Sequence, residues 1–154
     1  MREIPLTQGK IALISDEWYS FISLWGWHYH PHGYAVRNTR VEPRSLLPMH
    51  RVIMGTLGLH EVEVDHIDGN RLNNQVSNLR IVTLAQNRRN RKRQSTNQTP
   101  YKGVGLHGWK YRARIGIEGR MIQIGTYATA IEAAQAYNEA AIIHHGEFAR
   151  LNEL

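Results

Sequence analysis

Residues 64–87 read VDHIDGNRLNNQVSNLRIVTLAQN. An alternating run ends just before Asp65 and His66, and a second run rich in apolar and β-branched residues lies 15 residues further on. Both runs are typical of strands, and the Gly- and Asn-rich segment between them is typical of a loop. The predicted order is strand, loop, strand and basic helix, over Glu61–Val64, Asp68–Ser77, Leu79–Thr83 and Leu84–Arg93.

A His next to an Asp at a strand end suggests hydrolytic chemistry. The imidazole can act as a general base near neutral pH, and the carboxylate is a hard ligand for Mg²⁺ or a similar ion. An Asn amide on the following helix can complete such a site for metal-assisted phosphodiester hydrolysis. An ordinary Asn-rich turn is the alternative, whereas an EF-hand is disfavoured because no Glu closes the loop.

The stretch resembles the HNH homing endonuclease family, which has a ββα-metal fold. The similarity covers Val64–Asn87 without a gap, and Met49–Met54 and Gly9–Leu13 also resemble phage and mobile-element members. The resemblance implies two catalytic positions. His66 would be the general base, and Asn78 would brace the loop and orient His66. It implies two metal ligands, Asp65 and Asn87. Asn rather than His at position 87 favours a hard ion, Mg²⁺ first and Mn²⁺ second.

Length and charge bound the remaining possibilities. The 154 residues carry 19 Lys and Arg against 13 Asp and Glu, a net charge of +6, and no Cys. Zero Cys excludes disulfides, thiolate zinc sites and a Cys nucleophile. No apolar run approaches the ~20 residues of a membrane span, and the N-terminus lacks a signal-peptide pattern. We therefore expect an intracellular protein, which the resemblance places in the cytoplasm or nucleoid of a bacterial or phage-infected host.

The positive charge is concentrated in the middle of the chain. Residues 1–79 have a net charge of −1, residues 80–120 of +10 and residues 121–154 of −3. Such a block suits a phosphate backbone, although a solvated face, a flexible linker or a nuclear-localisation-like run are alternatives. The DNA contacts predicted from its first part are Arg80, Arg88, Arg89, Arg91, Lys92 and Arg93.

A polar stretch at 94–100 predicts a linker between a nuclease domain at 1–93 and a second domain at 101–154. The second domain shows three strand-like runs and a helix: Tyr101–Leu106, Trp109–Ile117, Met121–Tyr127, and 130 to about 145. Thr129 and Glu132 predict a capping box at the start of that helix, and Gly146 predicts its end. The whole chain is expected to be α+β.

The second domain also carries familiar motifs, which read YKGV at 101–104, WKYRARI at 109–115 and GEFARLN at 146–152. Over Thr99–Asn152 the chain is similar to the APETALA-type (ethylene-response-factor-like) DNA-binding domain. That resemblance implies a three-stranded sheet in the major groove of double-stranded DNA with the helix packed behind it.

Strand alternation supports the same assignment. Lys110, Arg112 and Arg114 share one face of their strand, while the residues between them face the helix. In the third strand Ile122 and Ile124 are expected to face the helix and Met121 and Gln123 to point outward; Gln can pair with adenine. A merely solvated sheet face is the alternative. The predicted contacts of this domain are Lys102, Trp109, Lys110, Arg112, Arg114 and Gln123.

The N-terminal residues predict a scaffold. Ser15 is expected to cap a helix whose inner face is Trp18, Phe21, Ile22 and Trp25. Further elements are a strand at Lys10–Ile14, strands at Trp27–Tyr29 and Gly33–Arg37, and a helix at Leu47–Met54. A surface hairpin around 30–33 is favoured over a zinc site on His28, His30 and His32. His50 is expected to pack or hydrogen-bond near the site, or to contact DNA.

These features together predict a metal-dependent DNA endonuclease of homing type. The alternative is a non-catalytic, sequence-specific DNA-binding regulator that retains an HNH-like fold. Double-stranded DNA is the expected partner, with no membrane partner, and a monomer is favoured.

Overall fold

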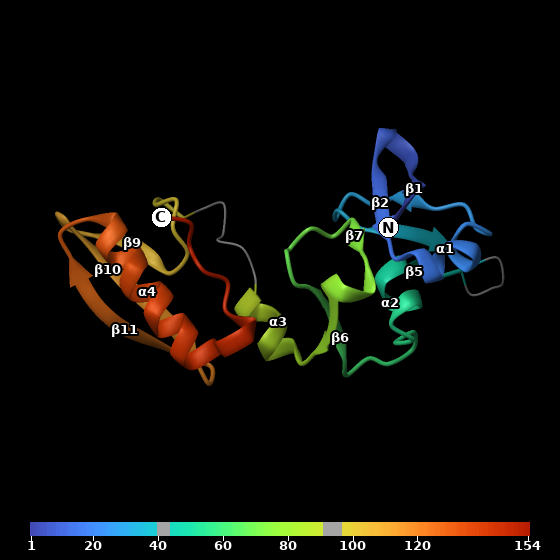
Figure 1. Cartoon of the computed structure of the whole chain (residues 1–154). Coiled ribbons are helices and arrows are strands. Elements are labelled where there is room, and N and C mark those ends of the chain that lie inside the picture. Colours follow the sequence, from blue (N-terminus) through green and yellow to red (C-terminus); the bar gives the residue numbers. More distant parts are fainter. Residues whose placement is uncertain (40–43, 91–96) are drawn as a thin grey trace. The chain divides into compact units, whose positions relative to one another are not determined.

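The computed structural model describes residues 1–39, 44–90 and 97–154. The chain divides into two compact units, Met1–Asn87 and Arg88–Leu154, each of which is treated by itself (Figure 1). The N-terminal unit combines small sheets with short helices. The C-terminal unit is one sheet with one long helix.

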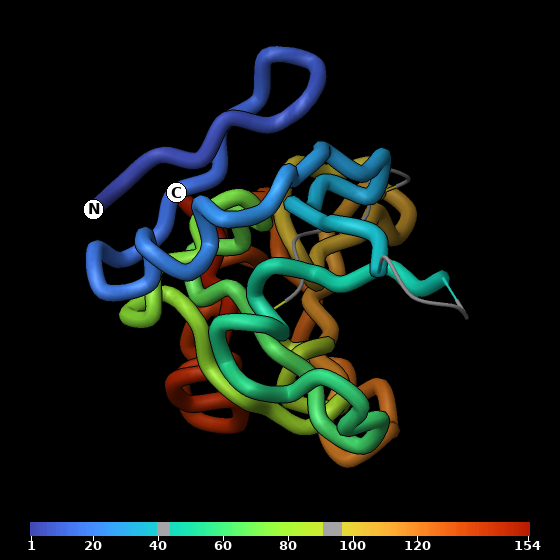
Figure 2. The backbone as a smooth tube through the Cα atoms, turned by 90° about the vertical axis from the view of Figure 1, so that its right-hand side faces the viewer, coloured from blue at the N-terminus to red at the C-terminus, as the bar shows by residue number. Residues whose placement is uncertain are grey.

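A three-stranded sheet opens the N-terminal unit. It contains β1 (Arg2–Pro5), β2 (Ile11–Ile14) and β7 (Asn73–Asn74). The connection between β1 and β2, in blue in Figure 2, includes a 3₁₀ turn, Thr7–Gly9, and the Thr7 Oγ1 accepts a hydrogen bond from the Tyr29 N–H at 3.0 Å. β7 pairs in parallel with β2, so the prediction of an uninterrupted loop over 68–77 was wrong. Non-local backbone pairing with Leu13 and Ile14 makes these two asparagines a strand, which local propensity does not reveal.

Helix α1 (Asp16–Ile22) begins where the sequence predicts. Ser15 occupies the N-cap position but makes no capping bond; its Oγ instead accepts a hydrogen bond from the Val76 N–H at 2.9 Å. Ile22 is fully buried, and Trp18 and Trp25 pack against the same core. Phe21 is exposed, so only part of the predicted inner face is in the core.

The predicted hairpin around 30–33 is confirmed. It joins β3 (His28–Tyr29) to β4 (Ala35–Asn38), and β5 (Leu46–Pro48) pairs with the other edge of β4. Helix α2 (Met49–Ile53) follows directly, shorter than the predicted 47–54 because Leu47 and Pro48 belong to the strand.

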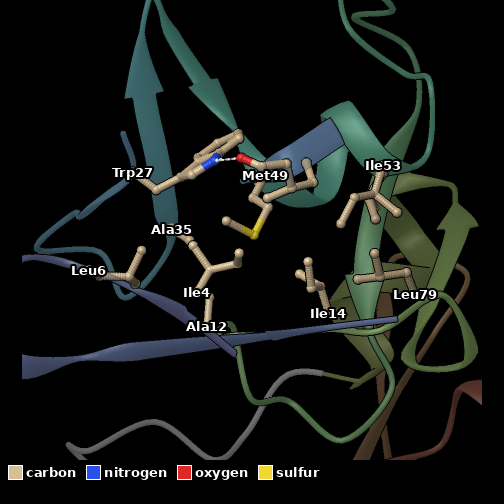
Figure 3. Packing of buried hydrophobic residues seen from close by; sticks show 11 residues of the cluster. Ile4, Leu6, Ala12, Ile14, Trp27, Ala35, Met49, Ile53 and Leu79 are labelled. Carbon is tan, nitrogen blue, oxygen red and sulfur yellow. Dashed lines mark hydrogen bonds between the residues drawn. The ribbon is translucent and has the colours of Figure 1, made fainter. Parts of the chain in front are cut away.

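The core of this unit anchors the site. Met49, Ile14 and Ile22 are fully buried, and Figure 3 shows Met49 among the surrounding aliphatic side chains. Val64 and Leu79 belong to the same cluster. They lie on β6 (Glu63–His66) and β8 (Leu79–Val82), an antiparallel pair. Burying these two side chains contributes about 1.5–3 kcal/mol each and ties the hairpin to the core.

Two short helical segments flank β8. A 3₁₀ turn, Val76–Asn78, precedes it, and α3 (Leu84–Asn90) follows it. Thr83 starts α3: its Oγ1 accepts from the Gln86 N–H, and its own N–H donates to Gln86 Oε1 at 2.8 Å. The predicted end of this helix at Arg93 lies outside the described residues.

The C-terminal unit has the predicted meander and helix. Its elements are β9 (Val104–His107), β10 (Lys110–Ile117), β11 (Arg120–Tyr127), α4 (Ala130–His145) and a 3₁₀ turn, Gly146–Phe148. The strand order is β11-β10-β9, all antiparallel. The capping box of Thr129 with Glu132 is present in full, and Gly146 ends α4 with φ 53°.

Polar contacts close this unit at both ends. The Asn138 side chain donates to the Asn152 carbonyl through Nδ2 and accepts from the Asn152 N–H at Oδ1. The Asn152 side chain in turn accepts from the Lys102 N–H and donates to the Lys102 carbonyl. Thr99, in the predicted linker, is buried and donates to the carbonyl of Val104 at 2.7 Å. The residues just before the first strand therefore contribute to this unit.

Candidate active site

The β6–β8 hairpin presents Asp65 and His66 at the end of β6. Its register pairs Asp65 with Arg80 and His66 with Leu79. Because side chains alternate along a strand, Asp65 shares a face with Arg80, and His66 shares one with Val64 and Leu79. Both site residues are buried, Asp65 at 7% and His66 at 4% exposure. A buried carboxylate next to a buried imidazole is costly without partners.

Asp65 has such a partner in Arg80. The guanidinium Nη2 and Nε donate to Asp65 Oδ2 at 2.9 and 3.1 Å. The Arg80 side chain is mostly buried, so this is a charge-assisted pair within the unit. The structure thus places Arg80, predicted as a DNA contact, against the predicted metal ligand.

Asn78 holds the loop after β6. Its Oδ1 accepts from the Asp68 N–H at 3.1 Å, and its Nδ2 donates to Asp68 Oδ1 at 3.0 Å and to the Asn73 carbonyl at 2.8 Å. Burial raises the pKa of Asp68, but hydrogen bonds from Asn70, Asn73 and Asn78 outweigh it, so the pKa is lowered. The loop is therefore a hydrogen-bonded structure around an ionised Asp68, with Asn78 bracing it.

His66 lies in an aromatic cluster. Its ring centroid is 5.1 Å from that of His50, in an edge-on arrangement, and 6.1 Å from that of Tyr34. Its Nε2 lies 3.4 Å from Asn74 Oδ1. Burial lowers the pKa of His66, against the raising effects of Asn74, Asp68 and Asp65. The imidazole is therefore neutral at pH 7 and able to accept a proton.

His50 on α2 is buried beside this ring. Among the described residues its Nδ1 has no hydrogen-bond partner, so the predicted packing is present without a bond at this atom. Burial lowers the pKa of His50 to about 3, with smaller contributions from His66 and two arginines. The guanidinium of Arg71, from the loop after β6, lies 4.7 Å over the centroid of the Tyr34 ring.

The low pKa of His50 predicts acid sensitivity of the N-terminal unit. An unfolded His has a pKa of about 6.5, so below that pH the unfolded state binds a proton that the folded state excludes. This stability is complete above pH 6.5 and falls by about 1.4 kcal/mol per pH unit toward pH 3. Between pH 7 and 5 we expect His50 to account for a loss of about 2 kcal/mol.

Urea unfolding followed by tryptophan fluorescence measures this loss. The chain has four Trp, and a Trp109→Phe background leaves only those of the N-terminal unit. His50→Phe in that background should remain more stable at pH 5, relative to its own pH 7 value, than the unsubstituted background. Parallel pH dependences for the two proteins would contradict the prediction.

The second predicted metal ligand, Asn87, lies half-buried on α3, one turn after Thr83. Within the described residues, no three His, Cys, Asp or Glu side chains gather to hold a metal. The two predicted ligands, Asp65 and Asn87, would offer carboxylate and amide oxygens, a donor set that fits Mg²⁺. Because Arg80 already balances the charge of the Asp65 carboxylate, an ion bound there would compete with this guanidinium.

Outside the sheet, the predicted DNA contacts of the C-terminal unit are Lys102 and the basic run that begins at Arg88. Lys102 is half-buried and its Nζ donates to the Arg89 carbonyl; burial, with the Arg150 charge, lowers the pKa of Lys102 to about 8. Arg88 is exposed and Arg89 half-buried. The remaining basic positions of this run lie outside the described residues: Arg91, Lys92 and Arg93.

The sheet contacts share one face, as predicted. Arg112 pairs with Gly105 and Thr126, and Arg114 pairs with the exposed Gln123. Between Ala113 and Arg114 the register shifts by one residue, because β11 has an extra residue, Ile124, at a bulge. The shift lets Thr126 and Gln123 lie on the same face of the sheet as the two arginines with which they pair.

The opposite face of the sheet packs against α4. Ile115 is buried with Tyr137 and Ala141, and Ile124 packs against the same cluster. Ile122 pairs with Ile115 but is 45% exposed. Of the two residues of the third strand that were expected to face the helix, only Ile124 therefore belongs to this core.

Sequence reasoning missed three members of the site. Tyr34, Arg71 and Asn74 lie around His66. Tyr34 is outside the stretch 64–87, and Arg71 and Asn74 are inside it but were given no role there. The turn glycine Gly33, whose φ is 90°, sets the direction of the chain into Tyr34. The Asn73–Asn74 doublet was the feature of the sequence that could have pointed to Asn74 as a member of the site.

Comparisons with known proteins find a family match over the segment that contains this site. A family model described as HNH endonuclease matches residues 55–89, which include β6, the braced loop, β8 and most of α3. An uncharacterised HNH endonuclease of Acanthamoeba polyphaga mimivirus is 32% identical over 152 residues, covering 96% of this chain and 77% of the relative. No helix among the described residues has the length and apolar character to cross a bilayer. The chain belongs to the HNH endonuclease family, which implies nuclease activity on DNA.

Proposed function

We propose that the protein is a homing-type DNA endonuclease that hydrolyses phosphodiester bonds with one divalent metal ion. The observation that carries the proposal is the buried Asp65–His66 pair at the end of β6, followed by a loop that Asn78 braces. Asp65 and Asn87 would hold the ion, most favourably Mg²⁺, with Mn²⁺ as a substitute. When bound, the ion supplies Lewis-acid polarisation of the phosphate and stabilises the leaving oxygen.

The protein's own residues supply the remaining chemistry. His66, neutral because burial lowers its pKa, takes the proton of the attacking water. Asn78 keeps the loop after β6 in one conformation through its bonds to Asp68 and Asn73. Arg80 balances the charge of Asp65 while the site is without substrate. General-base catalysis of this kind typically contributes about 10²–10⁴-fold to the rate.

The C-terminal sheet is proposed to select and hold the DNA. Lys110 and Arg114 are exposed, Arg112 is half-buried on the same face, and Trp109 is fully exposed at 101% in the turn between β9 and β10. Two of the positions around them are glycines, Gly105 and Gly116, so the face offers little steric obstacle to a groove. Phosphate contacts would fix the register, and Gln123 would read a base edge.

Replacing Arg112 and Arg114 together with Ala is expected to weaken DNA binding and flatten its salt dependence. Removing one phosphate contact reduces the slope of log K against log salt by about 0.9, so the slope of the double variant should be smaller by about 1.8. Fluorescence anisotropy of a labelled duplex at several salt concentrations measures both effects. The double Lys variant keeps both charges and should keep the slope; an unchanged slope in the Ala variant would refute the sheet assignment.

A random duplex library separates this proposal from a non-catalytic regulator. The protein is incubated with the library and Mg²⁺, and the new DNA ends and the bound intact duplexes are both sequenced. A nuclease gives ends at a preferred position within an enriched sequence. A regulator gives an enriched sequence with intact duplexes, in Mg²⁺ and in Mn²⁺ alike.

A further inference from the structure

Asn74 is fixed by the backbone on which it lies. It belongs to β7, whose register pairs it with Ile14 of β2, and the Leu13 N–H donates to the neighbouring Leu72 carbonyl at 2.8 Å. Ile14 is fully buried in the core, and Asn74 itself is 1% exposed. The position of this side chain is therefore set by the N-terminal sheet, not by the loop alone.

The orientation of the Asn74 amide follows from its second contact. Its Nδ2 donates to the Leu72 carbonyl at 3.1 Å, which assigns the other amide atom, Oδ1, to the His66 side. An amide oxygen can only accept a hydrogen bond. The nitrogen that lies 3.4 Å from it, His66 Nε2, must therefore carry the hydrogen if the two atoms bond.

The ring that makes this contact is also enclosed at its sides. His50 meets it edge-on at 5.1 Å between centroids, and Tyr34 lies at 6.1 Å. These neighbours limit the space in which the imidazole can turn, and a hydrogen bond to one nitrogen selects between the two ring orientations. The 3.4 Å separation is long for an N–H···O bond, and catalytic hydrogen bonds often tighten only when substrate is bound.

We propose that Asn74 is a positioning residue for His66: its Oδ1 holds the imidazole as the Nε2–H tautomer, so that Nδ1 is the atom that accepts the proton. The two asparagines of the site then have separate tasks. Asn78 bonds atoms of Asp68 and Asn73 and holds the loop, whereas Asn74 sets the ring. The catalytic meaning of this assignment rests on the proposed function, but the tautomer itself does not.

Nitrogen NMR of the full-length protein reads the tautomer directly. The chain is labelled with ¹⁵N-histidine and studied in EDTA at pH 8, where His66 is neutral; the His66→Ala spectrum assigns the His66 signals among the nine histidines. The expected result is a protonated Nε2 and an unprotonated Nδ1. A protonated Nδ1 would overturn the proposal, whether or not the protein cleaves DNA.

Substitutions test whether Asn74 is the cause. Asn74→Leu keeps the approximate shape without the acceptor and should give a mixture of tautomers, with kcat lower by about 10–100-fold and KM for DNA within about two-fold. Asn74→Asp keeps an acceptor and should keep the Nε2–H tautomer. Asn73→Ala, one residue away, should also keep it, because the Asn73 side chain bonds Asp68 and Gln75.

Two outcomes oppose the proposal. In the first, Asn74→Leu keeps both the wild-type tautomer and the wild-type kcat. In the second, Asn73→Ala changes the tautomer as much as Asn74→Leu does, which would assign the effect to the loop as a whole. If Asn74→Leu does not fold, the wild-type spectrum and Asn74→Asp still decide. If no DNA cleavage is found in any protein, the proposed function fails while the tautomer result stands separately.

Discussion

Replacing His66 with Ala is expected to lower kcat for DNA cleavage by about 10²–10⁴-fold, the usual contribution of a general base. The side chain is buried, neutral and held between Asn74 and the rings of His50 and Tyr34. Alanine removes the proton acceptor but leaves the Asp65–Arg80 pair and the C-terminal sheet unchanged. Affinity for DNA should therefore stay within about two-fold, which separates an effect on chemistry from an effect on binding.

Single-turnover cleavage of a defined duplex, with protein in excess, measures this rate constant. His60→Ala is the matched control because His60 is exposed in the loop before β6; it should retain the wild-type rate. A His66→Ala protein that cleaves as fast as wild type would remove His66 from the mechanism.

Gly103→Ala is expected to destabilise the C-terminal unit by about 3 kcal/mol, because backbone strain and overpacking each cost about 1–3 kcal/mol. Gly103 has φ +76°, and a Cβ added there would lie 2.1 Å from the Tyr137 ring and 2.7 Å from the Arg114 carbonyl oxygen. Tyr137 is a buried member of the core between sheet and helix, so the ring cannot move without opening that core.

Hydrogen exchange of the β10 amides detects this loss within the unit. A loss of about 3 kcal/mol corresponds to about a hundred-fold faster exchange where the amides exchange through unfolding of the unit. Gly108→Ala is the matched control: its φ is +59°, but no atom lies within 4 Å of the added Cβ. It should cost only about 1–2 kcal/mol, the cost of the left-handed conformation alone. Equal exchange rates in the two variants would show that Tyr137 yields to the added methyl group.

Local signals predicted much of the C-terminal unit. Alternation along Lys110–Ile117 separates the two faces of the sheet, and the Thr129–Glu132 capping box marks the start of α4. Both signals are contained within a few residues of sequence, so they need no knowledge of distant contacts. The bulge beside Arg114 was not predictable, because it depends on pairing with β11.

The N-terminal unit was less predictable because its decisive contacts join distant residues. Ser15 has the character of a helix cap, yet its hydroxyl accepts from Val76, 61 residues away. Asn73 and Asn74 have the character of a loop, yet they pair with β2. The same non-local pairing places Asn74 beside His66, and the antiparallel register places Arg80 beside Asp65.

The order of elements around the site was nevertheless evident from the sequence. The two strands and the helix expected around residues 64–87 are present, with β6 displaced by two residues toward the C-terminus. β7 and a 3₁₀ turn interrupt the expected loop. That displacement brings Asp65 and His66 inside the strand, where pairing with β8 fixes their backbone. Family resemblance supplied the roles, and the structure adds the neighbours through which those roles would be carried out.

Nicking of supercoiled plasmid DNA tests most directly whether this protein is a metal-dependent nuclease with His66 as its base. Wild-type protein and His66→Ala, purified in parallel, are compared in Mg²⁺ and in EDTA, with binding measured on the same DNA. We predict conversion to open-circular or linear DNA by the wild type in Mg²⁺ only, and almost none by His66→Ala. Tight binding without cleavage in Mg²⁺ and in Mn²⁺, or equal cleavage by both proteins, would contradict this mechanism.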